Sequence, residues 1–169
     1  VLIWSAPLLA LYARHVSWRV MFFTGLVAVL LLHAQWAVVQ FVVQHDLGMQ
    51  LTGESDIAAN IDGVAKFATV DGKLIRAYGP YTHSNSLGGA LVVGFVLLSL
   101  LIREKFFVSL RYSRLFVVLS AGLLAFGVLL TFSRAAYLGL GLWLVLNFIL
   151  FRESRWARSL LRRVFLVSF

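Results

Sequence analysis

The sequence contains no cysteine and few charged residues, and both absences narrow the classes of protein to which it can belong. Without cysteine there is no disulfide framework, no thiolate metal site and no cysteine nucleophile, so any chemistry must use other groups. Charged residues make up only 13% of the 169 residues, whereas 61% are apolar. This composition excludes an ordinary water-soluble domain and predicts a chain whose main solvent is lipid.

No internal repeat, low-complexity tract or cleavable signal peptide is evident along the chain. We therefore expect residues 1–169 to form a single membrane domain. The sequence begins without methionine inside one apolar run and ends inside another, so we expect it to be part of a longer protein.

The apolar runs predict an all-α, polytopic bundle of five to six transmembrane helices. A helix needs roughly 20 residues to cross a hydrocarbon core of about 30 Å. The first run is truncated, the second is long enough, the next three are slightly short, and a sixth begins near Val164. The first five runs are 1–12, 20–43, 86–102, 115–132 and 135–151.

The net charge of +8 is distributed in short basic clusters between the apolar runs. Such clusters are typical of the cytoplasmic loops of membrane proteins, so nucleic-acid binding is not expected. The basic connections hold Arg14 and Arg19, residues 103–114 and residues 152–163. The connection 44–83 carries five acidic residues against three basic ones, so we expect an extracytoplasmic loop there.

Turn sequences within this loop, at 52–55, 62–63 and 71–72, separate short apolar stretches at 67–70 and 74–75. Turn residues at this spacing predict a small hairpin or a compact loop that rests on the membrane surface.

Polar residues at the outer span boundaries are the candidates for chemistry. Two guanidinium groups and an imidazole at one membrane surface would suit a pyrophosphate, because guanidinium forks bond phosphate oxygens in pairs. A helix that begins near 84–86 would add free N–H groups and the positive end of its dipole. The candidates are Arg76, Tyr78, His83, Asn85 and Arg134, the last in a tight outer turn.

Structural roles compete with this interpretation. Arg134 can snorkel to lipid headgroups or cap the carbonyls that end the preceding span. Ser84, Asn85 and Ser86 suit helix N-caps, and His83 alone suits a solvated surface position.

A second polar group lies inside the run 20–43, where His33, Gln40 and Gln44 share one helical face. Such a stripe either lines a wet substrate path or forms hydrogen bonds to a neighbouring helix. The glycines of the later runs suit close helix packing.

Two motifs resemble those of the O-antigen ligase and O-antigen polymerase family. Residues 75–89 read Ile-Arg-Ala-Tyr-Gly-Pro-Tyr-Thr-His-Ser-Asn-Ser-Leu-Gly-Gly, similar to the family's Arg-Ala-Tyr-Gly, short gap, and His-Pro-Asn before a span. Residues 130–136, Leu-Thr-Phe-Ser-Arg-Ala-Ala, resemble the family's Ser-Arg-Gly turn. The resemblance covers roughly residues 48–150, with Ser84 in place of the usual proline and Ala135 in place of the usual glycine.

This resemblance implies a glycosyltransferase of the bacterial cytoplasmic (inner) membrane. It would move a glycan from undecaprenyl pyrophosphate to a lipid or sugar acceptor on the outer face, with no metal or nucleotide-sugar cofactor. Arg76 and Arg134, with His83, would bind the pyrophosphate and stabilise it as a leaving group. The supporting residues would be Tyr78, Asn85 and Ser133.

The family's proposed catalytic histidine lies in a second outer loop, which we expect beyond Phe169, so no general base is assigned in this chain. The main alternative is a transporter or flippase fragment whose pathway is lined by His33, Gln40 and Gln44. A non-catalytic membrane scaffold is a third possibility.

Overall fold

The computed structural model describes residues 18–58, 60–70, 72–103 and 113–151, and the account that follows concerns these residues. The expected spans at 1–12 and near Val164 lie outside this part of the chain. So do the basic connection 152–163 and most of the connection 103–114.

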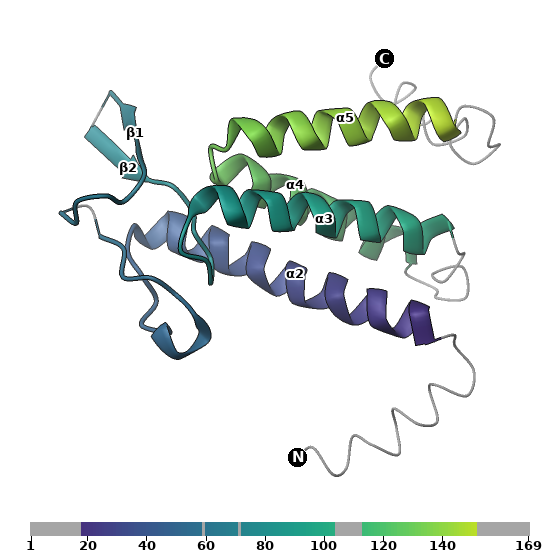
Figure 1. Ribbon diagram of the computed structural model, residues 1–169, viewed down its shortest axis with the longest axis horizontal. Helices are drawn as coiled ribbons and strands as arrows, with labels where there is room; N and C mark the ends of the chain where they lie inside the picture. The colour runs from purple at the N-terminus through teal and green to yellow at the C-terminus, as the bar shows by residue number, and fades with distance from the viewer. Residues whose placement is uncertain (1–17, 59, 71, 104–112, 152–169) are drawn as a thin grey trace, which may run out of the picture.

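The described chain is mostly helical, with four α-helices that lie side by side (Figure 1). Helices α2 and α4 end, and α3 and α5 begin, at the end of the bundle where the long loop lies. The apolar runs therefore predicted these helices to within a few residues at each end. The helices are α2 (Trp18–Val43), α3 (Ser84–Arg103), α4 (Ser113–Leu130) and α5 (Arg134–Phe151).

Two of these helices are long and apolar enough to cross a membrane, Val20–Val43 in α2 and Ser84–Ile102 in α3. The apolar parts of α4 and α5, Leu115–Leu130 and Arg134–Ile149, are shorter. Within the described residues, the structure thus supports two helices of spanning length and leaves the expected five to six spans a prediction.

Glycines allow close contacts between helices, although only some glycines of the later runs take part, since a Cβ atom added at Gly89, Gly122 or Gly141 would meet nothing within 4 Å. A Cβ atom added at Gly127 of α4 would lie 2.8 Å from Leu91 Cδ1 of α3. One added at Gly94 of α3 would lie 3.2 Å from Leu30 of α2 and from Leu124 of α4. Glycine therefore lets α2, α3 and α4 approach one another closely. Helix α5 packs mainly against α3.

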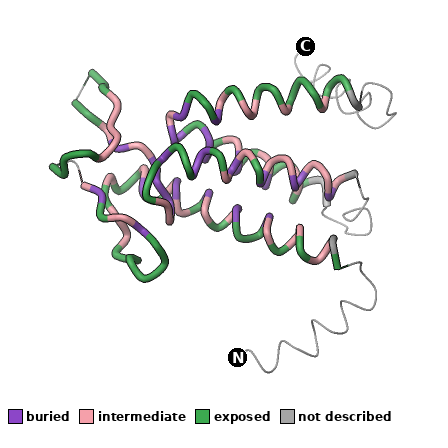
Figure 2. Tube along the Cα trace, viewed as in Figure 1, coloured by how far each residue is buried: buried purple, intermediate pink, exposed green. Residues whose placement is uncertain are grey.

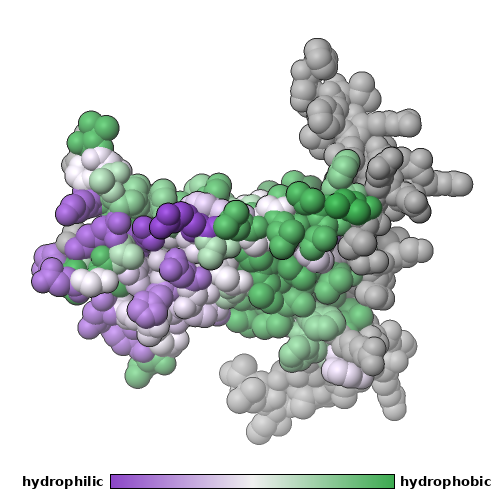
Figure 3. All heavy atoms as spheres, turned by 45° about the horizontal axis from the view of Figure 1, so that its top comes forward, coloured by the Kyte–Doolittle hydropathy of each residue, from purple (hydrophilic) through white to green (hydrophobic). Residues whose placement is uncertain are grey.

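Apolar side chains also cover the outside of the helices, whereas polar residues gather at the loop end (Figure 3). Phe22, Phe126 and Leu138 are exposed on three different helices. A helix that is apolar all round requires an apolar environment outside the bundle as well as inside it. Buried residues concentrate where helices meet one another and where the loop joins the bundle (Figure 2).

The loop between α2 and α3 contains a short 3₁₀ turn, η1 (Gln50–Thr52), and two strands. Strands β1 (Lys66–Thr69) and β2 (Gly72–Ile75) pair antiparallel, with Lys66 opposite Ile75 and Thr69 opposite Gly72. The hairpin that the turn residues predicted is therefore confirmed. It makes the described fold mostly, but not entirely, helical.

Candidate anion-binding site

The loop is fastened to α2 by the polar stripe of that helix. Gln40 is 2% exposed, and its side-chain oxygen accepts hydrogen bonds from the N–H groups of Tyr78 (3.1 Å) and Gly79 (2.7 Å). Its NH₂ group donates to Gly79 O (3.3 Å) and to Glu54 Oε1 (2.5 Å). Gln44 Oε1 accepts from Ile75 N–H at 2.7 Å.

His33 belongs to the same stripe, and its Nδ1 atom shares a hydrogen bond of 3.1 Å with the hydroxyl of Tyr81 in the loop. The three polar residues therefore bind the loop. Their hydrogen bonds to the loop are a role that the sequence did not suggest. The sequence did not predict these hydrogen bonds between α2 and the loop, because residues 31 to 48 positions apart cannot be paired from spacing alone.

Glu54 is the acidic residue that completes this attachment, and it is 4% exposed. Its carboxylate accepts hydrogen bonds from Trp36 Nε1 (3.0 Å), Gln40 Nε2, and the backbone N–H groups of Leu47 and Met49 (2.8 Å each). Burial by itself would raise the pKa of Glu54, but these four donors hold the pKa below its ordinary value. The carboxylate is thus ionised near neutral pH, and both of its oxygen atoms accept hydrogen bonds.

The segment that carries Arg76 is also held by hydrogen bonds to the hairpin region and to the end of α4. Arg76 N–H donates to Ala65 O at 3.1 Å, which extends the pairing of the hairpin by one residue. Ala77 N–H donates to Leu130 O, the last residue of α4, at 3.0 Å. The hydroxyl of the buried Tyr78 accepts from Ala65 N–H at 2.6 Å. Tyr78 therefore supports the loop by fixing its backbone.

The side chain of Arg76 is half-buried beside the first turn of α5. Its Nε atom is buried and has no hydrogen-bond partner among the described residues. Its guanidinium lies close enough to the phenol of Tyr137 for the two groups to interact electrostatically. The Tyr137 hydroxyl donates to Leu129 O at 2.7 Å.

The turn between α4 and α5 presents Arg134 at the same end of the bundle. Phe132 has a left-handed backbone (φ 49°) and stacks on Phe67 of the hairpin with ring centroids 3.8 Å apart. The buried hydroxyl of Ser133 accepts a hydrogen bond from Ala136 N–H at 3.3 Å, so Ser133 acts as the N-cap of α5. Arg134 is exposed as the first residue of that helix.

Helices α3 and α5 begin next to each other. A Cβ atom added at Gly88 would lie 2.8 Å from Ala136 Cβ and 2.9 Å from Thr131 Oγ1. Two positive helix ends therefore face the same region. His83 and Asn85, at the start of α3, are exposed there. No capping bond from the side chains of residues 84–86 is present in this described part of the chain.

The structure thus gathers the predicted cationic residues at one end of the bundle, although it assigns them different environments. Arg76 lies in the loop, half-buried and near Tyr137 of α5, whereas Arg134 is exposed as the first residue of α5. His83 lies at the adjacent start of α3. Interfacial snorkelling of Arg134 remains compatible with its exposure. Within the described residues, no three His, Asp or Glu side chains are grouped as a metal ion would need.

Comparison of the chain with models of protein families, with curated proteins and with solved structures finds no match. The resemblance to O-antigen ligases and polymerases therefore rests on the two sequence motifs alone.

Proposed function

We propose that this chain forms the donor-binding part of a glycan transferase of the bacterial cytoplasmic membrane, similar to O-antigen ligases and polymerases. Arg76 and Arg134 would bind the pyrophosphate of an undecaprenyl-linked glycan, and the glycan would pass to a lipid or sugar acceptor on the outer face. The observation that carries the proposal is the buried, unpartnered Nε of Arg76 beside the start of α5.

The environment of Arg76 favours an anionic ligand. A buried N–H group without an acceptor is unfavourable, and a hydrogen bond to a charged acceptor contributes about 1.5–3 kcal/mol. A phosphate oxygen would supply that acceptor. Two neighbouring helix N-termini and a second guanidinium add to the positive potential. A diphosphate has enough oxygen atoms to engage both arginines at once.

The same arrangement suits the chemistry of glycan transfer. When the bond between the sugar and the diphosphate breaks, negative charge grows on the departing diphosphate. Guanidinium groups fixed in advance near that charge stabilise the transition state more than the ground state. The acceptor hydroxyl must also lose a proton, and no base for that step is assigned among the described residues.

The surface that continues from Arg134 suits a lipid-linked donor. Leu138 and Leu142 follow Arg134 at intervals of four residues on one face of α5, and both are exposed. A ligand whose phosphates meet Arg134 can therefore lay an apolar chain along this face. A free sugar phosphate would gain nothing from such a surface.

Replacing each arginine separately tests the proposal. We expect Arg76→Ala and Arg134→Ala each to lower the transfer rate by roughly 10²- to 10³-fold, the usual cost of removing one donor to a developing anion. The assay uses the full-length protein and an undecaprenyl-pyrophosphate glycan in vitro. Arg76→Lys should recover only part of the rate, because lysine lacks the planar fork.

Lys73→Ala provides the matched control, because Lys73 is an exposed cation on the hairpin of the same loop. It should leave transfer unchanged. Near-normal transfer in both arginine variants, with normal membrane expression, would refute the site.

The transport alternative depended on His33, Gln40 and Gln44 lining a pathway. These side chains form hydrogen bonds to the loop, so the observation that motivated transport has another explanation.

A further inference from the structure

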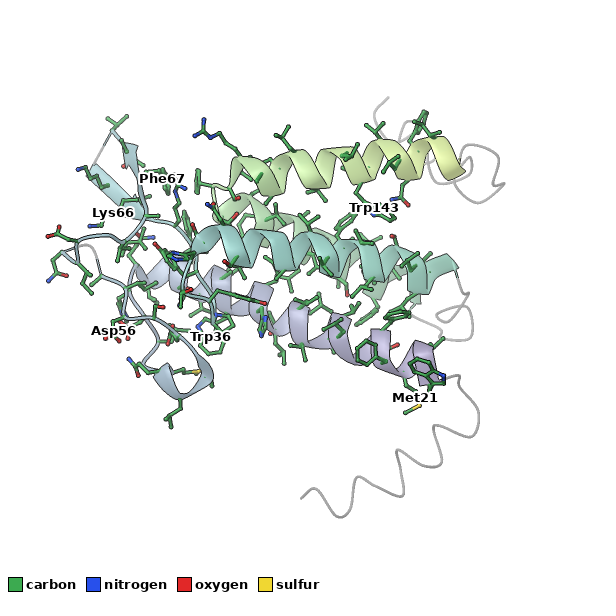
Figure 4. All side chains as sticks on the ribbon, viewed as in Figure 1. Met21, Trp36, Asp56, Lys66, Phe67 and Trp143 are labelled. Carbon is green, nitrogen blue, oxygen red and sulfur yellow. The ribbon has the colours of Figure 1, made fainter. Side chains whose placement is uncertain are left out.

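Gln40 and Glu54 meet where α2 joins the loop, next to Trp36, which Figure 4 labels on that helix. Both side chains are almost completely buried. We propose that this pair, here called the Gln40–Glu54 latch, positions Arg76 for binding pyrophosphate. The inference rests on the proposed function and assigns the two residues a positioning role, with no contact to the substrate.

The latch reaches Arg76 through a short chain of contacts. Gln40 holds the backbone N–H groups of Tyr78 and Gly79, two and three residues after Arg76. Gln44 holds Ile75, the residue before it. Arg76 therefore lies between two points at which α2 fixes the backbone, and its own N–H is held by Ala65.

Glu54 determines which way the amide of Gln40 points. A glutamine side chain has one accepting and one donating end, whereas an ionised carboxylate can only accept. Because Glu54 accepts from the NH₂ group of Gln40, the oxygen of Gln40 must face the N–H groups of Tyr78 and Gly79. Without the carboxylate, the opposite orientation would leave those two N–H groups facing a donor.

The arrangement also explains why a charged group is kept in a buried position. A buried carboxylate is unfavourable unless donors surround it, and Glu54 has four. Those donors come from α2 and from the loop. The charged carboxylate therefore links α2 to the loop through hydrogen bonds to both.

Small displacements of a binding group have large effects. A misplacement of about 1 Å can cost on the order of 10²-fold in rate, even when the mutated residue lies far from the chemistry. We therefore expect disruption of the latch to weaken the binding of undecaprenyl pyrophosphate about 10-fold or more, with the arginine itself intact.

Exchanging the two residues provides the test. Glu54→Gln and Gln40→Glu should each weaken binding of undecaprenyl pyrophosphate by the full-length protein in lipid nanodiscs. Each should also accelerate hydrogen exchange at the amides of Tyr78 and Gly79. The double exchange Gln40→Glu with Glu54→Gln should regain neither property, because an amide at position 54 would turn its NH₂ group toward N–H donors that now meet the carboxylate. Asn60→Asp is the control for a change from amide to acid, because Asn60 is exposed in the loop.

A cycle with Arg76→Ala separates positioning from general destabilisation. Arg76→Ala should leave amide exchange at Tyr78 and Gly79 near normal. In that background, Glu54→Gln should accelerate exchange as before and weaken binding no further, because the group that it positions is already gone.

Four results would overturn either the latch or the proposed function. Unchanged exchange in the single variants, or additive losses of binding in the cycle, would overturn the latch. Normal binding by the single variants would overturn it as well. Absence of binding by the wild-type protein would overturn the proposed function itself.

Discussion

The negative charge of Glu54 stabilises the attachment of the loop to α2. Its carboxylate is buried and accepts four hydrogen bonds, and its pKa lies below the ordinary value because these bonds outweigh the effect of burial. As the pH falls, the unfolded chain takes up the proton at this site before the folded protein does. Ionised Glu54 therefore stabilises the folded state, and acid removes that contribution.

This behaviour predicts a pH dependence for the loop. Its stability should be complete above the ordinary glutamate pKa of about 4.3 and should decline as the pH falls from there through the lower pKa of the folded state. Glu54→Gln should be less stable at neutral pH and should lose less on acidification. Limited proteolysis of the loop across this pH range measures both effects.

The exposed Asp56 supplies the control, because Asp56→Asn should retain the wild-type pH profile. Parallel pH profiles for Glu54→Gln and the wild-type protein would show that another group is responsible.

At the scale of single residues, the sequence predicted the end of the bundle at which Arg76, His83 and Arg134 lie, because alternating helices place alternate connections together. It did not predict the role of Glu54, which looked like one of five acidic loop residues. Its partners lie on a helix and in a separate turn, and no spacing rule links them. Ser133 was predicted as a support for the ligand, and its role as the N-cap of α5 was not predicted.

At the scale of elements, the contact between the first turns of α3 and α5 holds the site together. We expect Gly88→Ala to destabilise the protein by about 1–3 kcal/mol, the usual cost of overpacking, because the added Cβ would clash with Ala136 Cβ and Thr131 Oγ1. The variant should also bind donor more weakly. Thermal denaturation in detergent measures the first effect.

Gly89→Ala is the matched control, because a Cβ atom at that position meets nothing within 4 Å. It should be neutral or slightly stabilising, since alanine favours a helix more than glycine does. Combining Gly88→Ala with Ala136→Gly removes the shortest contact and should restore part of the stability. Equal stability of the Gly88→Ala and Gly89→Ala proteins would contradict the packing argument.

The elements themselves were predictable because apolar runs and turn residues are local signals. The helices and the hairpin accordingly match the sequence prediction. The anchoring of the hairpin was not predictable, since it depends on Phe67 stacking with Phe132 from a turn 65 residues later. Phe132 adopts its left-handed backbone within that aromatic contact.

At the scale of the whole molecule, a polar loop end and an apolar helical body are clearly separated (Figure 3). Composition predicted this division, because the loop contains most of the acidic residues and the helices almost no charge. The expected number of spans stays a prediction. The apolar parts of α4 and α5 are shorter than the two helices of spanning length, so length alone does not decide their position.

The central claim is that this loop end binds a lipid diphosphate through Arg76 and Arg134. The most direct measurement compares the affinities of the wild-type protein, Arg76→Ala and Arg134→Ala for undecaprenyl pyrophosphate and for undecaprenyl monophosphate in nanodiscs. We expect the wild-type protein to prefer the diphosphate at least 10-fold, since a second phosphate can engage the second guanidinium, and each variant to lose most of that preference. Equal affinity of the wild-type protein for the two lipids, or an unchanged preference in both variants, would contradict the account.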